Sequence, residues 1–246
     1  MTRETILKIT KADLDADNVY IGAVDLSKEF DGSIEIQSGL GTVKFKTSIR
    51  VRFSLVALDK SGIFAGGGIS AGDRISAGDR ISAGGGIFSS GEISAVDGIF
   101  AGGGIFAGEG ITAGGEISAG RGITAGWGVS ARLGISASEG ISAGVGISAG
   151  EGISAVDGIT AVEGINAGGG IFSSGEISAG DGISAGGGIF AGFQITSKWI
   201  SSKGRIFAGI CFWRIPTIEE TEIHGELREG IICFGTHVLP KKNEAA

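Results

Sequence analysis

The side chains that could act as a general base or a nucleophile are few and lie near one end of the sequence. The two histidines and the two cysteines all follow residue 210: His224, His237, Cys211 and Cys233. They form neither a nucleophile–base pair nor a motif with zinc-ligand spacing. The cysteines are expected to be reduced structural thiols. The sequence therefore predicts no catalytic residue, no metal site and no cofactor.

Charged residues in the middle of the chain are mostly acidic. Between residues 63 and 197, 12 Asp and Glu accompany four Arg. Arg74 and Arg80 each follow an aspartate, which predicts local ion pairs with Asp73 and Asp79 worth under about 1 kcal/mol each. Because the whole chain has a net charge of −7, direct nucleic-acid binding is not expected. An acidic inhibitor that imitates nucleic acid stays open, although this segment has only about a third of the charge density of a duplex.

These residues lie within or beside a six-residue repeat. From Ile63 to Ile195 an Ile or Val occupies every sixth position, with Val129 the one substitution, which gives 23 hexads of consensus Ile-Ser-Ala-Gly-x-Gly. A helix has 3.6 residues per turn, so it cannot keep this period on one face, and each Gly would cost it about 1 kcal/mol. Gly accounts for 49 of 246 residues, but it lacks the three-residue period and the abundant Pro of collagen.

An extended hexad has the geometry of one side of a coil. Side chains alternate between two faces, so Ile at position 1 and Ala at position 3 point inward, while Ser, Thr or Phe at position 2 points outward. Gly at positions 4 and 6 lets the chain turn a corner, with a positive φ available to it. Three sides give a coil of about 18 residues, and coils stacked about 4.8 Å apart form a three-sided β-solenoid. The predicted fold class is all-β.

The repeat resembles that of the hexapeptide-repeat β-helix proteins over residues 63–208, and long Gly-Ile arrays also resemble uncharacterised phage and bacterial solenoid proteins. The resemblance favours a left-handed turn. Its internal phase differs, because the left-handed acyltransferases have a small residue four places after the aliphatic one, where this chain has Trp127, Leu133 and Val145 among others. Those acyltransferases use a histidine in or beside the coils as general base. Residues 63–197 contain none, so no acyltransferase activity is expected.

The repeat becomes irregular towards both ends, which divides the chain into four parts. They are a β-rich cap, an irregular leading coil, the regular solenoid, and a hairpin-like C-terminal cap with the tail: residues 1–42, 43–62, 63–208 and 209–246. The last part is expected to cover the final Ile layer and the open edge of the sheet.

No segment of the sequence favours a membrane location. Residues 1–4 lead directly into a short predicted strand without an apolar signal segment, and no run of about 18 apolar residues occurs. We expect a cytoplasmic protein of a bacterial cell or an infected host, with no membrane partner.

The outward positions suggest two kinds of binding surface. Rows of Ser and Thr would form flat, regular faces, which leaves open a role in binding ice or a polysaccharide surface. Phe at some outward positions is more specific, because exposed aromatic side chains in a row mark a contact surface.

Residues 18 apart should lie on the same side in successive coils, which predicts two ladders of outward Phe. The longer one keeps its register although the interval from Ile195 to Ile200 is one residue short. The predicted interface residues are the two ladders and one corner residue, expected to stack on Val145: Phe172, Phe190 and Phe207; Phe88 and Phe106; and Trp127.

The ladders predict a non-enzymatic scaffold or protein-binding solenoid that associates with itself, as a homodimer or larger assembly, or with a protein partner. Burying outward rings against a second copy through a two-fold axis is the simplest arrangement. In the alternative, the C-terminal segment with Phe212 and Trp213 folds back over the rings.

Overall fold

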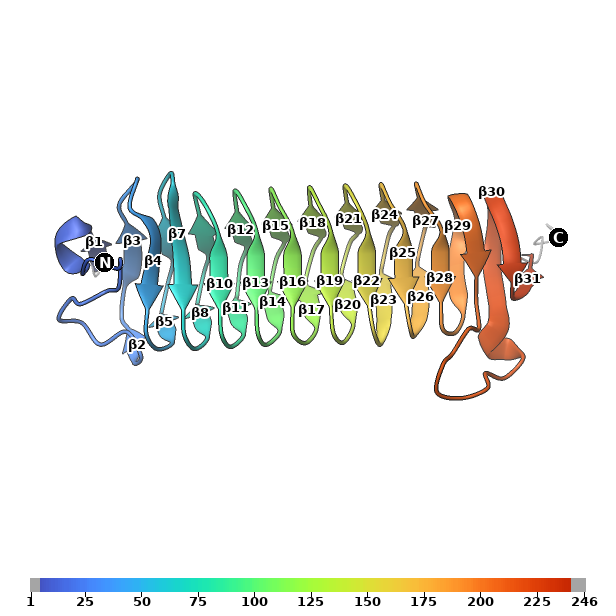
Figure 1. Cartoon of the computed structure of the whole chain (residues 1–246), viewed down its shortest axis with the longest axis horizontal. Helices are drawn as coiled ribbons and strands as arrows, with labels where there is room; N and C mark the ends of the chain where they lie inside the picture. The colour runs from blue at the N-terminus through green and yellow to red at the C-terminus, as the bar shows by residue number, and fades with distance from the viewer. Residues whose placement is uncertain (1–4, 240–246) are drawn as a thin grey trace, which may run out of the picture. The chain divides into compact units, whose positions relative to one another are not determined.

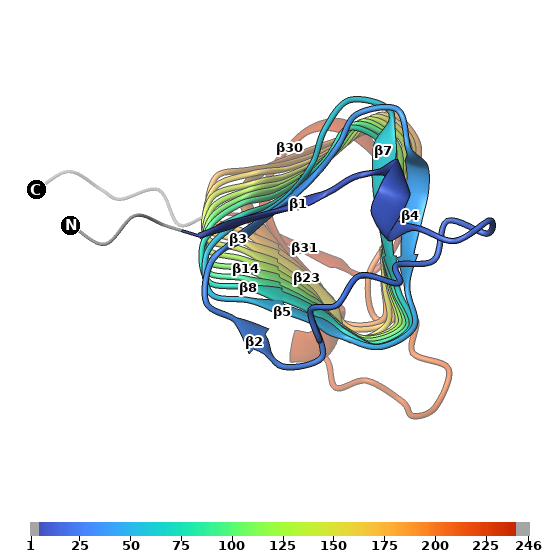
Figure 2. The same cartoon turned by 90° about the vertical axis from the view of Figure 1, so that its left-hand side faces the viewer.

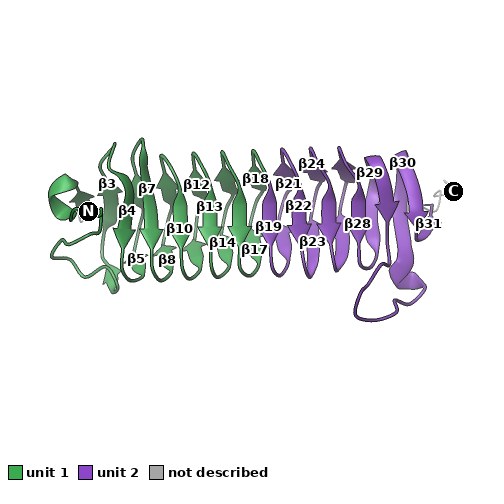
Figure 3. Cartoon of the chain, viewed as in Figure 1, with its two compact units in different colours: residues 1–133 green, residues 134–246 purple. Residues whose placement is uncertain are grey.

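The computed structural model describes residues 5–239, and within them the regular secondary structure is almost entirely short β-strands joined by bends (Figure 1). It contains two short 3₁₀ turns, η1 (Lys11–Asp13) and η2 (Glu219–Thr221), and no α-helix in the described part. Two compact units are formed, residues 1–133 and residues 134–246, and each is considered by itself (Figure 3).

Unit 1 contains eighteen of the strands. They are β1 (Ile6–Ile9), β2 (Glu29–Phe30), β3 (Ser33–Ile36), β4 (Gly41–Phe45), β5 (Ile49–Val51), β6 (Leu55–Ala57), β7 (Ser61–Ala65), β8 (Ile69–Ala71), β9 (Ile75–Ala77), β10 (Ile81–Ala83), β11 (Ile87–Ser89), β12 (Ile93–Ala95), β13 (Ile99–Ala101), β14 (Ile105–Ala107), β15 (Ile111–Ala113), β16 (Ile117–Ala119), β17 (Ile123–Ala125) and β18 (Val129–Ala131).

Unit 2 contains the other thirteen described strands. They are β19 (Ile135–Ala137), β20 (Ile141–Ala143), β21 (Ile147–Ala149), β22 (Ile153–Ala155), β23 (Gly158–Ala161), β24 (Ile165–Ala167), β25 (Ile171–Ser173), β26 (Glu176–Ala179), β27 (Gly182–Ala185), β28 (Ile189–Ala191), β29 (Ile195–Phe207), β30 (Glu222–Phe234) and β31 (Thr236–Val238).

Both units are parallel β-solenoids, as predicted. In the regular part of unit 1, each strand pairs with the strand three places later, so Ile81 of β10 lies between Ile63 of β7 and Ile99 of β13. The same 18-residue register holds in unit 2, where β22 pairs with β25 and β25 with β28. Figure 2 looks along the coils, and in it β4 and β7 share one side while β5 and β8 share another.

The core of each unit is a set of stacked Ile side chains with Ala beside them. Ile141 and Ala143 of β20 are only 1% and 3% exposed, whereas Ser142 between them faces solvent. The inward and outward positions of the hexad are therefore confirmed. Because one coil cannot bury its own Ile from both sides, each layer is stabilised by its neighbours.

The corner glycines do not use the positive φ that the sequence allowed for. Among the described residues, the positive-φ glycines all lie outside the regular array: Gly39, Gly41, Gly209, Gly225, Gly230 and Gly235. Inside it, space favours Gly at some corners: a Cβ on Gly84 would lie 2.3 Å from the Gly66 carbonyl oxygen of the preceding coil. Real Cβ contacts are never this short, so the close stacking of coils selects Gly at this corner.

Parallel pairing extends beyond the regular array at the N-terminal side. β1 pairs with β3, β3 with β6 and β6 with β9, so the Ile stacks continue into residues 6–57. β2 pairs with β5 in the same direction. The segment predicted as a β-rich cap thus contains strands stacked on the solenoid.

The prediction of a hairpin-like C-terminal cap is wrong. β30 runs parallel to β29, with Ile223 paired to Ile195 and Leu227 paired to Ile200, and β31 is parallel to β30. A hairpin needs antiparallel strands. Residues 208–221, called here the C-terminal loop, instead leave the coil and return in the original direction. The chain then forms one more, irregular coil, and the spaced apolar residues of that coil extend the Ile stacks.

Candidate functional site

The long Phe ladder lies on β25, β28 and β29 of unit 2, in the predicted register. Phe172 is paired with Phe190, and Phe190 with Phe207. The ring centroids are 6.3 Å and 5.7 Å apart, respectively. Phe172 is 52% exposed, and the other two rings are half-buried. The deletion between Ile195 and Ile200 is absorbed within β29 and does not shift the ladder.

The short Phe ladder lies on β11 and β14 of unit 1, again as predicted. Phe88 and Phe106 are paired in register, and their ring centroids are 6.0 Å apart. They are 52% and 45% exposed. Both ladders therefore present aromatic surface that the chain itself does not cover.

A groove runs beside each ladder. The unit 1 groove has a volume of about 230 Å³ and is lined by Glu29, Val51, Ser70, Ala71, Gly72, Phe88, Ser89, Ser90 and Phe106. The unit 2 groove has a volume of about 340 Å³ and is lined by Ser154, Ala155, Val156, Phe172, Ser173, Ser174, Phe190 and Phe212. The unit 2 lining is mostly apolar, so that groove suits an apolar group. Glu29 and the Ser hydroxyls make the unit 1 lining about half polar, so that groove suits a group with both apolar and polar atoms.

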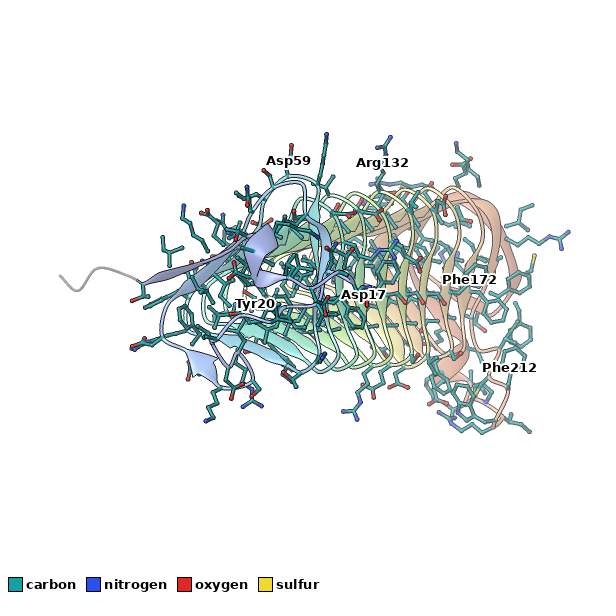
Figure 4. All side chains as sticks on the ribbon, turned by 60° about the vertical axis from the view of Figure 1, so that its left-hand side comes forward. Asp17, Tyr20, Asp59, Arg132, Phe172 and Phe212 are labelled. Carbon is teal, nitrogen blue, oxygen red and sulfur yellow. The ribbon has the colours of Figure 1, made fainter. Side chains whose placement is uncertain are left out.

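The C-terminal loop reaches one ladder without covering it. Phe212 forms part of the wall of the unit 2 groove together with Phe172 and Phe190, but it is itself 80% exposed. Figure 4 shows Phe172 and Phe212 on the outside of the coils. Trp213 packs edge-on against Phe193, with centroids 6.2 Å apart, and not against a ladder ring. The C-terminal loop therefore does not bury the ladder under Phe212 and Trp213, as the alternative had it.

A compact set of polar contacts holds the C-terminal loop. The Arg214 guanidinium donates two hydrogen bonds of 2.6 Å to the carboxylate of Glu220, and the Thr217 amide donates a third of 2.9 Å. Arg214 also lies 4.4 Å from the ring centroid of Phe193. These hydrogen bonds, the one from Arg214 first, lower the pKa of Glu220 to about 2.

The same contacts leave the apolar side chains of the loop in solvent. Phe212, Ile215 and Ile218 are 80%, 93% and 77% exposed. Large apolar side chains left this exposed on one anchored loop are of the kind that marks an interaction site.

One aromatic residue of the long ladder, Phe234, escaped the sequence analysis, which named Phe212 only as part of a segment that in one alternative covers the rings. Phe234 of β30 pairs with Phe207 and extends the ladder by one position, and Phe212 joins its groove. Phe234 comes 27 residues after Phe207 because the C-terminal loop is inserted between them. The 18-residue rule therefore misses it, and since the register of β29 on β30 shifts several times, the pairing of Ile223 with Ile195 would not have placed it either.

The predicted corner residue Trp127 is exposed to 63%, and its neighbour Leu133 to 44%. Both belong to unit 1, where they lie six residues apart at successive corners of the solenoid. Val145, 39% exposed, belongs to unit 2, so its predicted stacking with Trp127 stays a prediction.

The ion pairs at the corners differ from those predicted. Arg80 pairs with Asp97 at 3.3 Å, and its guanidinium lies 4.9 Å from the ring centroid of Phe100. Asp97 occupies the same corner one coil later than Asp79, about 4.8 Å away. Asp73 accepts a hydrogen bond of 2.8 Å from the Ser54 hydroxyl. Charges at a corner thus find partners along the stack rather than next in sequence.

The two histidines have partners within strands β30 and β31. His224 lies 2.7 Å from a carboxylate oxygen of Glu222, and His237 lies 2.8 Å from the carbonyl oxygen of Gly225. Cys211 and Cys233 are free thiols. Over residues 5–239, no cluster of three or more His, Cys, Asp or Glu side chains with metal-binding geometry occurs.

Two findings concern the chain as a whole. The described residues include no helix with the length and apolar character needed to cross a membrane. Searches with family models, among curated proteins and among solved structures found no match to this chain.

Proposed function

We propose that this chain is a non-enzymatic scaffold solenoid that binds protein, in the first place a second copy of itself, through its outward Phe ladders. The observation that carries the proposal is the in-register stack of outward rings at Phe172, Phe190 and Phe207, of which Phe172 is 52% exposed. Each ladder lies beside a groove.

The exposed area of the long ladder favours association. An aromatic side chain buries about 150–250 Å² when fully covered. Phe172, which is half-exposed, therefore has roughly 100 Å² left to bury, which is about 2.5 kcal/mol, and the two less exposed rings add smaller amounts. A two-fold axis lets the same ladder on two copies cover itself, which doubles the gain.

The cellular setting that we propose follows from the sequence repeat. The six-residue Ile repeat supports a relationship to hexapeptide-repeat solenoids and to phage or bacterial solenoid proteins. We place the scaffold in the cytoplasm of a bacterial cell or an infected host, with a protein partner and without direct contact to nucleic acid.

The proposal is tested by sedimentation velocity of the wild type and of a Phe172→Ser, Phe190→Ser, Phe207→Ser variant. The wild type is expected to form dimers or larger species, and the variant to stay monomeric. The matched control is Phe64→Ser with Phe100→Ser, two outward rings that pair with Ser82 and belong to no ladder.

Circular dichroism checks that each variant is folded. Where the triple variant unfolds, the single change at Phe172, the most exposed ring of the ladder, is used instead. A wild type that is monomeric at high concentration, or a folded ladder variant that associates like the wild type, contradicts the proposal.

A further inference from the structure

The two grooves are built from the same sequence. Residues 83–95 and residues 167–179 are identical over 13 positions, Ala-Gly-Gly-Gly-Ile-Phe-Ser-Ser-Gly-Glu-Ile-Ser-Ala. Each copy is followed by a second Phe 18 residues after its own, Phe106 in unit 1 and Phe190 in unit 2. No other stretch of the array repeats an outward Phe with two following serines.

Equivalent residues of the two copies line equivalent positions. Phe88, Ser89 and Ser90 line the unit 1 groove, and Phe172, Ser173 and Ser174 line the unit 2 groove. The preceding coil adds a Ser-Ala pair in each case, Ser70-Ala71 and Ser154-Ala155.

The first serine of each copy is a structural residue. Ser89 and Ser173 are 3% and 2% exposed. The Ser89 hydroxyl donates a hydrogen bond of 2.6 Å to the carbonyl oxygen of Asp73, and Ser173 accepts one of 3.1 Å from the Gly175 amide. The buried hydroxyls hold the corner beside the Phe, so both grooves share a defined wall.

The two grooves differ in the side chains that lie beside the Phe ladder. In unit 2 the chain supplies its own aromatic, Phe212 of the C-terminal loop. The unit 1 groove has Glu29 and Val51 at its margin and no aromatic ring other than Phe88 and Phe106. A phenyl ring needs a space of roughly 150 Å³, so the open unit 1 groove of about 230 Å³ has room for one ring against Phe88 and Phe106, with Glu29 and the Ser hydroxyls beside it.

We propose that the unit 1 groove receives the tip of the C-terminal loop of a second copy of this chain. The donor is the segment 211–218, whose Phe212, Ile215 and Ile218 are almost fully exposed on an anchored loop. The internal precedent supports this occupant, because the same loop already meets the other copy of the same groove. The inference rests on the proposed self-association and names a second contact for it.

Such a contact is heterologous: the donor and acceptor surfaces are different. Each copy that docks leaves one loop and one groove free, so the contact propagates into an open chain or closes into a ring. A two-fold contact through the long ladder alone stops at a dimer. The two contacts therefore predict different limits of assembly.

The test uses one variant defective in each surface. The donor variant carries Phe212→Ser and Ile215→Ser, and the acceptor variant carries Phe88→Ser and Phe106→Ser. A second acceptor variant, Ser70→Trp, fills the groove from an exposed position without removing an apolar contact. Phe64→Ser with Phe100→Ser is again the control, and circular dichroism establishes that each protein is folded.

Fluorescence-detected sedimentation then follows a labelled acceptor variant in mixtures. We expect it to bind the unlabelled donor variant at least about tenfold more tightly than it binds the unlabelled acceptor variant, because only the first mixture joins an intact loop to an intact groove. That mixture stops after one loop–groove contact. The wild type and the control continue to larger species.

Three results overturn the inference. The first is equal binding of the labelled acceptor variant to the unlabelled donor and acceptor variants. The second is that both acceptor variants assemble as the wild type does, which would mean that the groove binds another partner. In these two cases self-association, and with it the proposed function, still stands. The third is a monomeric wild type, which contradicts both the proposed function and the loop–groove contact.

Discussion

At the scale of single residues, the position in the hexad decides whether a side chain must be apolar. Ile141 lies in the Ile stack and is 1% exposed, while Ser142 beside it faces solvent. Ile141→Asp places an unpaired charge in this stack at a cost of several kcal/mol. We expect the variant to unfold or aggregate, and Ser142→Asp to change the melting temperature little. Thermal melts by circular dichroism decide, and equal melting of the two variants would mean that the face assignment is wrong.

Glycine at the corners provides a second residue-scale prediction. A Cβ on Gly108 would lie 1.9 Å from the Ser90 carbonyl oxygen, whereas a Cβ on Gly110 would lie 3.5 Å from the Gly128 carbonyl oxygen. Gly108→Ala should destabilise the protein by roughly 1–3 kcal/mol, because the coils must move apart. Gly110→Ala is the matched control and should cost less than half as much. Denaturant unfolding measures both, and similar losses would disprove the spatial role of Gly108.

At the scale of elements, the anchoring of the C-terminal loop depends on one carboxylate. Since the pKa of Glu220 is lowered from its usual 4.5 to about 2, the Arg214–Glu220 pair contributes fully above pH 4.5 and is lost as the pH falls through about 2. The loop should therefore keep its conformation at pH 3 to 4, where ordinary carboxylates take up protons. An NMR titration of the Glu220 carboxyl carbon measures this. Arg214→Gln should raise the midpoint, and a wild-type midpoint near 4.5 would show that the pair is not formed.

The elements also show how far the sequence predicts the fold. A six-residue period of Ile determines strand, corner and register together, because each coil repeats its neighbour. The pairing of Phe172 with Phe190 and of Phe88 with Phe106 followed from counting alone. The left-handed turn expected from the resemblance stays a prediction.

The sequence failed where the period ends. Nothing local states whether a chain leaving the coil after Phe207 returns antiparallel or parallel, since Ile223, Leu227 and Ile232 are spaced by four and five residues. They nevertheless continue the Ile stacks of β29, with positive-φ glycines at Gly225 and Gly230 between them. Phe234 joins the long ladder only through this return, so no spacing rule could have placed it.

At the scale of the whole molecule, the protein is an acidic chain that, as we propose, associates through apolar surface. Its net charge of −7 makes copies repel at low ionic strength, and salt screens this repulsion while leaving apolar burial intact. A nucleic-acid mimic would behave in the opposite way, because salt weakens a contact between an acidic surface and a basic partner. The salt dependence of association therefore distinguishes a self-associating scaffold from a nucleic-acid mimic.

The central claim is that the exposed Phe ladders drive self-association, and sedimentation equilibrium of the wild type over a range of concentrations tests it most directly. The series is run at low salt and at about 0.5 M salt, where the Debye length is only a few ångströms. The account predicts an average mass that rises with concentration beyond that of one chain and is equal or greater in high salt. A monomer at every concentration, or an assembly that dissolves as salt is added, would contradict it.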